Sequence, residues 1–258
     1  MKILCIGDVF GIEAVDRLSK LLPAYKRECG IDFCIVNGEN SDGASGCEAD
    51  SIRAILGAGA DVVTGGNHTL RYRSMKEMLD EYDRVLRPAN FSENAHGSGY
   101  TIQTAFDGTR VLTVNLIGEI GLKNLSAISP FKKLDNILSF EEGNYDIAIV
   151  DFHAEATSEK AALGYMFSDK VGAVFGTHTH VPTADASIIG GRCGFITDVG
   201  MSGPKNSIIG VKIEHVLSLF CEGKTHGFAT GDGEIIIRGI IFEFDSDRKC
   251  TLARRVEF

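Results

Sequence analysis

Two histidines separated by one residue, His178 and His180, stand in the sequence Gly176-Thr177-His178-Thr179-His180. The apolar run at 171–175 directly before them is typical of a buried strand. Two imidazoles that follow a strand end can point at one locus, and imidazole is the commonest protein ligand for metals. Two of the seven histidines of the chain lie in this stretch, which therefore indicates a metal-binding loop. The alternative is a pair of ordinary histidines.

Four other apolar runs of the chain, at 2–7, 33–36, 61–64 and 147–152, also end in residues that bind metals or transfer protons. With the stretch above, the five strand ends carry Asp8, Glu39 with Asn40, Asn67 with His68, His153, and His178 with His180. Taken singly, each has a plainer reading, such as a helix N-cap for Asp8 or a buried hydrogen-bonded histidine for His153. Active sites of open α/β sheets form at the carboxyl ends of strands. The coincidence at five successive strand ends therefore favours one shared site.

The chemistry of this ligand set indicates more than one metal ion. It contains two carboxylates, amide oxygens and at least three imidazoles but no sulfur, which suits a divalent ion such as Mn, Fe or Zn. These ligands outnumber what one ion needs. A bridging carboxylate with imidazoles divided between two ions is typical of a two-metal hydrolytic site. The sequence identifies no substrate-binding residue.

The elements that must position these residues are strands and helices that alternate early and hairpins that follow later. Two alternating runs, 100–104 and 111–116, flank Asp107-Gly108, which is a hairpin signal. The C-terminal part, with 195–198 and 234–244, is predicted to be mostly strand, interrupted by a helix near 216–220. This pattern favours a mixed α/β sandwich over a simple doubly wound sheet. Helical spacing is predicted near 15–22, 52–56, 75–79, 137–138 and 158–167.

Composition predicts one globular domain that covers residues 1–258, since 44% hydrophobic and 24% charged residues are ordinary values for such a protein. No apolar run is long enough to span a membrane. The seven cysteines contain no CxxC pair, which argues against a disulfide framework and a zinc–cysteine site. Together with a start that lacks a signal-peptide pattern, this predicts a cytoplasmic protein. The net charge of −9 argues against stable nucleic-acid binding.

The motifs also carry a resemblance. Gly66-Asn67-His68, the single His153 and the residues 176–180 resemble the calcineurin-like metallophosphoesterase superfamily. The chain is most similar to a bacterial branch, the 2′,3′-cyclic-nucleotide 2′-phosphodiesterases, and the match covers nearly the whole chain. This resemblance implies a four-layer αββα sandwich of two mixed β-sheets flanked by helices. The segments that carry it are 7–8, 37–40, 87–90, 151–160, 176–185 and 197–204.

Residue by residue, the resemblance divides the ligands between two divalent transition-metal ions. One ion would be bound by Asp8 and His180, with Asn40 near it. The other would be bound by Asn67, His153 and His178, and Glu39 would bridge the two. His68 would be the acid that protonates the leaving oxygen or stabilises the transferring phosphoryl group. The implied mechanism is in-line attack on phosphorus by a metal-bridging hydroxide.

The chain departs from the family pattern at several positions beside the expected site. Phe10 stands where the superfamily often has a metal-binding histidine, and Thr69 where an acidic residue commonly follows Asn-His. The first departure removes a ligand that Asn40 would replace, and the second leaves His68 without its usual orienting partner. The departures at Ser41-Asp42, Leu70-Arg71 and 12–14 lie beside the expected substrate crevice and bear on substrate preference.

These observations predict a dinuclear metal-dependent phosphodiesterase that acts on a small phosphodiester such as a cyclic nucleotide and assembles as a homo-oligomer. Three alternatives stay open: a metal-dependent phosphomonoesterase, a metal-dependent amidohydrolase, and a regulatory protein that binds metals with little catalysis. In amidohydrolases the His-x-His motif follows an early strand, whereas in this chain it follows a late one. Asn67 is also a poor fit to the ligands of that class. His68 argues against a purely structural metal site.

Overall fold

The computed structural model describes residues 1–122 and 127–258. Its first sheet is built around β1 (Lys2–Ile6), β2 (Phe33–Asn37) and β3 (Val62–Thr64), which run parallel. The C-terminal strands β12 (Arg238–Phe244) and β13 (Cys250–Glu257) extend this sheet antiparallel, in the order β13-β12-β1-β2-β3. Side chains of β1 alternate between the two faces, so that Leu4 packs toward the helices and Ile3 toward the other sheet. Burial on both faces explains the continuous apolar run of this strand.

The second sheet has six strands in the order β4-β5-β6-β7-β9-β8. The pair β4 and β5 is antiparallel, which confirms the hairpin predicted around Asp107-Gly108. The strands β5, β6, β7 and β9 are parallel, and β8 closes one edge antiparallel. The bounds are β4 (Tyr100–Thr104), β5 (Arg110–Ile117), β6 (Ile147–His153), β7 (Ala173–Thr177), β8 (Ser187–Ile189) and β9 (Cys193–Ile196).

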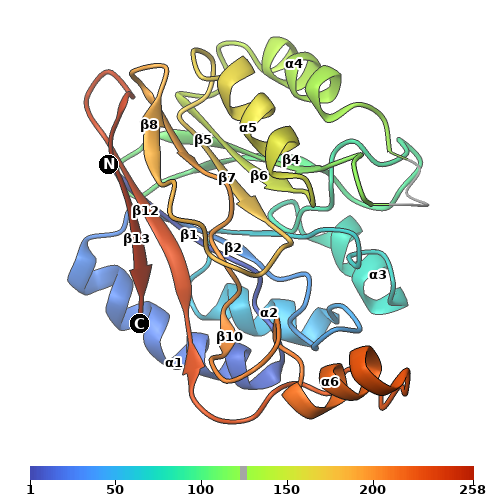
Figure 1. The fold of residues 1–258 in the computed structure, drawn as a ribbon. Helices are drawn as coiled ribbons and strands as arrows, with labels where there is room; N and C mark the ends of the chain where they lie inside the picture. Colours follow the sequence, from blue (N-terminus) through green and yellow to red (C-terminus); the bar gives the residue numbers. More distant parts are fainter. Residues whose placement is uncertain (123–126) are drawn as a thin grey trace.

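Helices cover the outer face of each sheet (Figure 1). The first sheet is covered by α1 (Ile12–Cys29), α2 (Ala49–Gly57) and α3 (Arg73–Glu81), and the second by α4 (Pro130–Phe140) and α5 (Thr157–Met166). Between the sheets, buried side chains of both, such as Phe33 and Phe175, form one apolar layer. The predicted four-layer αββα sandwich of two mixed sheets is therefore confirmed.

The strands predicted near 195–198 and 234–244 and the helix near 216–220 are confirmed, but the chain between β9 and β12 holds less strand than predicted. It contains only the short β10 (Gly203–Pro204) and β11 (Ile235–Ile236), which pair with each other, and the helix α6 (Ile213–Glu222). Gly200, shortly after the end of β9, has a φ of 85°, a backbone conformation that favours glycine, and the chain leaves the sheet there. This excursion leaves the sandwich and forms one wall of a cleft. None of the helices in the described ranges combines the length and hydropathy of a membrane span.

Candidate active site

The histidine loop begins immediately after β7, which runs two residues past the predicted end at 175 because its pairing with β6 continues to Thr177 opposite His153. His178 and His180 have φ values of 94° and 65°, a conformation that non-glycine residues adopt rarely and that concentrates at functional sites. The loop is tied to neighbouring strand ends, since the His178 amide donates to Asp8 Oδ2 over 3.1 Å. Two strained histidines are therefore held by the surrounding structure.

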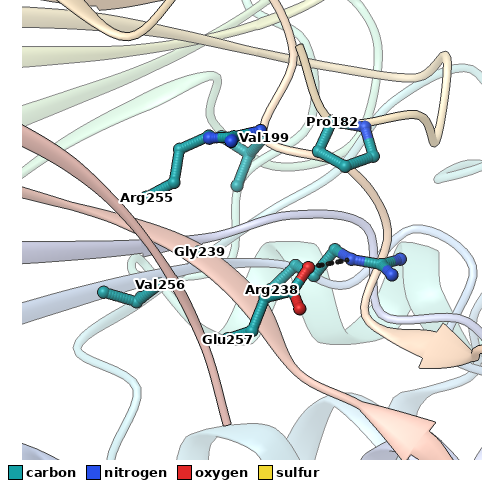
Figure 2. A pocket seen from close by; sticks show the side chains of 7 residues that line it. All are labelled: Pro182, Val199, Arg238, Gly239, Arg255, Val256 and Glu257. Carbon is teal, nitrogen blue, oxygen red and sulfur yellow. Dashed lines mark hydrogen bonds and ion pairs between the residues drawn. The ribbon is translucent and has the colours of Figure 1, made fainter. Parts of the chain in front are cut away.

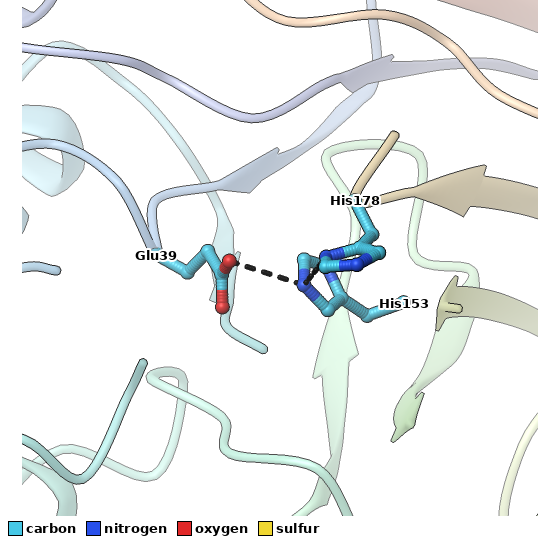
Figure 3. A group of neighbouring side chains, drawn as sticks. All are labelled: Glu39, His153 and His178. Atoms are coloured by element: carbon cyan, nitrogen blue, oxygen red, sulfur yellow. Dashed lines mark hydrogen bonds and ion pairs between the residues drawn. The ribbon is translucent and has the colours of Figure 1, made fainter. Parts of the chain in front are cut away.

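Three predicted ligands, Glu39, His153 and His178, form the tightest cluster (Figure 3). One ligand atom from each lies within 4.8 Å of the others. His153 Nε2 lies 3.1 Å from Glu39 Oε1 and 3.2 Å from His178 Nδ1. Glu39 follows β2 of the first sheet, whereas His153 and His178 end strands of the second. The site therefore depends on the packing of the two sheets.

The remaining predicted ligands surround this cluster more loosely. Asn67 Oδ1 lies 3.0 Å from His153 Nε2, which places Asn67 beside the cluster. Asp8 Oδ1 lies 3.9 Å from His180 Nε2 and 3.8 Å from His153 Nδ1. The Asn40 amide nitrogen lies 3.2 Å from His180 Nε2. All seven predicted ligands are therefore neighbours, and Asp8 lies between His153 and His180.

Asp8 is not a helix N-cap. The N-cap of α1 is Gly11, and no side chain of residues 1–122 or 127–258 caps that end of the helix. Asp8 is fully buried, and its Oδ1 has no hydrogen-bond partner within the described residues. A buried carboxylate oxygen without a partner is strongly unfavourable unless a cation or donor meets it. The plainer reading of Asp8 is therefore excluded.

The residues present fit a divalent metal centre. Oxygen and imidazole donors without sulfur suit Mn, Fe or Zn, and the free oxygen of Asp8 supplies a donor that the protein itself does not use. Gly66 leaves space open beside the cluster, because a Cβ added there would collide with Glu39 Oε2 and His153 Nε2. The chain thus keeps both charge and space available at the point where its ligands meet.

The pKa values in the cluster follow from buried carboxylates that face imidazoles. Burial alone raises the pKa of Glu39, but His153 beside it lowers the value to about 2. Burial alone lowers the pKa of His153, but Glu39 raises it to about 9. Burial, followed by the charge on His153, lowers the pKa of His178 to about 3. His178 is therefore neutral at pH 7, which is the form that binds metals.

Buried residues behind His153 orient its ring, and their role was not predicted from the sequence. His153 Nδ1 lies 2.9 Å from Thr177 Oγ1, and that hydroxyl donates to Asp151 Oδ1 over 2.7 Å. Asn37 also donates to Asp151, over 2.9 Å. Because the Thr177 hydroxyl proton goes to Asp151, its oxygen accepts from His153 Nδ1–H. His153 Nε2 therefore faces the oxygens of Asn67 and Glu39, where a bound metal would replace its proton.

Three further side chains of the block 151–160 make contacts that hold the site together. Glu155 Oε2 lies 3.0 Å from His178 Nε2 and orients that ring. Glu159 accepts the backbone amides of residues 119 and 120. Lys160 donates to Thr177 O and to Asp198 Oδ2, each over 2.7 Å. The motif signalled the importance of this block, but the roles depend on contacts with distant segments.

His68 lies at the edge of the cluster, with its side chain partly exposed. Its Nδ1 is 3.0 Å from Asn40 Oδ1, and its backbone amide donates to Glu39 Oε2 over 3.2 Å. Asn40 is therefore the orienting partner that the sequence left unidentified. Thr69 instead shapes the turn, because its hydroxyl accepts the Gly66 amide over 2.7 Å. Phe10, at the other departure, packs its ring edge to face with His180.

The ligands open onto a cleft of about 760 Å³, which is within the range of pockets that bind small molecules. Its walls come from the loop 42–45, from residues beside His68 and from the excursion around 209–230. A smaller cavity of about 170 Å³, where β12 and β13 meet Pro182 and Val199, contains none of the predicted ligands (Figure 2). The larger cleft is therefore the candidate substrate site. Its lining includes Phe10, Glu39, Asn40, Asp42, His68, Arg71, His178, His180, Val211 and Phe228.

Fold and site together define a metallophosphoesterase. The chain is similar over its whole length to the crystal structure of a novel phosphatase from Mycoplasma pneumoniae, with a TM-score of 0.91, 31% identity and 93% coverage of that chain. The chain also aligns over its whole length with 54% of a 5′-nucleotidase precursor from Thermus thermophilus, with a TM-score of 0.58. Because the two sequences are only 12% identical, this match shows a shared fold and nothing more.

The family follows from the sequence match. A model of the YmdB-like proteins matches residues 4–256, and the chain belongs to this family. It is 36% identical over 249 residues to the 2′,3′-cyclic-nucleotide 2′-phosphodiesterase of Bacillus subtilis, with 96% of this chain and 93% of that protein covered. The predicted resemblance is confirmed. The prediction of an enzyme that hydrolyses phosphoric diesters is likewise confirmed at the level of the family.

Proposed function

We propose that this protein hydrolyses 2′,3′-cyclic nucleotides at the 2′ bond, giving nucleoside 3′-phosphates, with two divalent transition-metal ions (Fe, Mn or Zn) per chain. The observation that carries the proposal is the meeting of Glu39, His153 and His178 beside the unpartnered oxygen of Asp8, at the base of a cleft of about 760 Å³. The activity named for the Bacillus subtilis relative supports the choice of substrate.

We propose that the ligands divide as the resemblance implies. Asn67, His153 and His178 would hold one ion, Asp8 and His180 with Asn40 the other, and Glu39 both. Bound ions of this kind lower the pKa of water from about 15.7 to about 7 and neutralise charge on a phosphoryl group. The protein itself positions the ligand side chains. Thr177 and Asp151 hold His153, and Glu155 holds His178. Asp198, which pairs with Lys160, accepts the amide and hydroxyl of Thr179 and so holds the loop between the histidines.

His68 is proposed as the general acid. Asn40 fixes its Nδ1, so the other ring nitrogen is free to donate a proton to the leaving 2′ oxygen. Burial lowers the pKa of His68, while an anionic phosphodiester bound in the cleft shifts it upward by favouring the charged ring. Both the position and the protonation of His68 therefore depend on groups at the cleft.

The test is an assay of purified protein with adenosine 2′,3′-cyclic phosphate, bis-p-nitrophenyl phosphate, p-nitrophenyl phosphate and an amide substrate. The expected result is hydrolysis of both diesters, release of adenosine 3′-phosphate, loss of activity with chelator and recovery with Mn²⁺. Hydrolysis of the monoester alone, of the amide alone, or of no substrate in the presence of Mn²⁺ would each contradict the proposal.

We also propose that residues 1–258 form a single domain, and that the enzyme is a cytoplasmic homo-oligomer. The single domain is supported by the shared apolar layer between the sheets and by a ligand set drawn from both. Limited proteolysis should not release an N-terminal fragment that keeps its metals. Sedimentation equilibrium should give a mass above 27.8 kDa, the mass of one chain.

A further inference from the structure

Arg71 is the one lysine or arginine among the residues of the described chain that line the cleft. The acids of the same lining are Glu39 and Asp42. Glu39 belongs to the ligand cluster, and the Asp42 carboxylate is used within its own loop, where it accepts the Glu48 amide over 2.7 Å and the Ser51 hydroxyl over 2.9 Å. Across residues 1–122 and 127–258, no carboxylate oxygen lies within 4.0 Å of the guanidinium of Arg71. A fixed positive charge without an acidic partner therefore faces the cleft of an otherwise acidic protein.

The guanidinium of Arg71 is held in place by the loop that forms the cleft wall. Its Nη1 donates to Ala44 O over 3.2 Å and to Ser45 O over 2.9 Å. In the described part of the chain, its other two nitrogens make no hydrogen bond to the protein. A planar guanidinium with one nitrogen anchored and the others free matches the geometry of a phosphate group.

Arg71 does not belong to the metal-ligand cluster. Its backbone amide donates to His68 O over 3.0 Å, which places it one turn beyond the proposed acid. Its side-chain hydrogen bonds go to the loop 44–45 and to none of the predicted metal ligands. The charge of the transferred phosphoryl group is met at the cluster. Arg71 is therefore placed to meet a different anionic group.

Building on the proposed function, we propose that Arg71 binds a second phosphate of the substrate. The substrate class is then a 2′,3′-cyclic nucleotide that also carries a 5′-phosphate, in preference to the same molecule without it. Hydrogen bonds to charged groups contribute enough to give a preference of about 10- to 100-fold. The cleft, at about 760 Å³, is large enough for a ligand of nucleotide size.

The test uses Mn²⁺-loaded full-length protein and two pairs of probes. Calorimetry compares the Kd of adenosine 3′,5′-bisphosphate with that of adenosine 3′-phosphate, which requires no turnover. Kinetics compare kcat/KM for adenosine 2′,3′-cyclic phosphate with and without a 5′-phosphate. Both comparisons are made for the wild type, for Arg71→Gln, and for the control Arg73→Gln, whose exposed side chain pairs with Glu77 on helix α3.

The expected result is a preference of about 10- to 100-fold for the 5′-phosphorylated probe, which Arg71→Gln abolishes and Arg73→Gln retains. Equal binding of both probes by the wild type would overturn the proposal, as would a preference that survives in Arg71→Gln. An equal loss on both cyclic substrates would show that Arg71 contacts the transferred phosphoryl group, and would also overturn it. If neither cyclic substrate is hydrolysed, the proposed function fails, while the binding comparison still decides the role of Arg71.

Discussion

Thr177→Val should weaken metal binding although Thr177 is not predicted to touch a metal. The substitution keeps the β-branched shape and removes one hydroxyl, which accepts from His153 Nδ1 over 2.9 Å and donates to Asp151 Oδ1 over 2.7 Å. Loss of such a supporting contact typically lowers metal affinity or activity by about 10- to 100-fold. The buried partners left unsatisfied should also reduce the free energy of unfolding by about 1–3 kcal/mol. Asp151 keeps Asn37 and Thr64 as donors, so the chain should still fold.

The matched control is Thr113→Val. Thr113 lies on β5, is fully buried, and its hydroxyl has no hydrogen-bond partner within the described chain. Removal of that hydroxyl should leave the free energy of unfolding unchanged or higher, with metal affinity unaffected. Equilibrium dialysis with Mn²⁺ and urea denaturation of both variants give the comparison. Wild-type Mn²⁺ affinity in Thr177→Val would refute the reasoning that Thr177 fixes the orientation of His153.

Three further substitutions test the roles of other residues at the site. His68→Ala should lower kcat on a 2′,3′-cyclic nucleotide by about 10²- to 10⁴-fold with metal content unchanged, whereas His178→Ala should lose metal as well as activity. The control is His96→Ala, at an exposed histidine that pairs with Asp80. Metal loss in His68→Ala would contradict the role of His68 as an acid. Gly66→Ala should lose metal and reduce the free energy of unfolding by about 1–3 kcal/mol, because its Cβ would collide with Glu39 Oε2. The control is Gly57→Ala on α2, where a Cβ meets nothing within 4 Å, and this substitution should not destabilise the protein. Normal metal content in Gly66→Ala would show that metal binding does not need the space beside Gly66.

Apolar strand runs such as β1 and β2, each followed by a glycine or polar residue, predicted a mixed α/β sandwich, and the family resemblance added its four layers. The sequence predicted the ligand positions as well, since strand ends mark the edge where the site forms. It placed the end of β7 two residues too early, because that end depends on pairing with β6 as far as His153. Pairing partners distant in sequence cannot be read from local pattern.

The supporting contacts could not be predicted from local sequence. Asn40 orients His68 across 28 positions, and Lys160 reaches Asp198 across 38. An asparagine in a loop and a lysine on a helix carry no local signal of such partners. Only the close match of the block 151–160 to one branch of the family indicated that these positions were constrained. Arg71 stands at a departure from the family pattern, and the role proposed for it rests on its contacts with the carbonyl oxygens of the loop 44–45.

The most direct test of the two-metal centre is anomalous scattering from crystals of the Mn²⁺-loaded protein, measured on both sides of the Mn absorption edge. Two peaks per chain are predicted, one among Asn67, His153 and His178 and one between Asp8 and His180, with Glu39 contacting both. A single peak from protein that is fully active, or peaks away from these residues, would contradict the account.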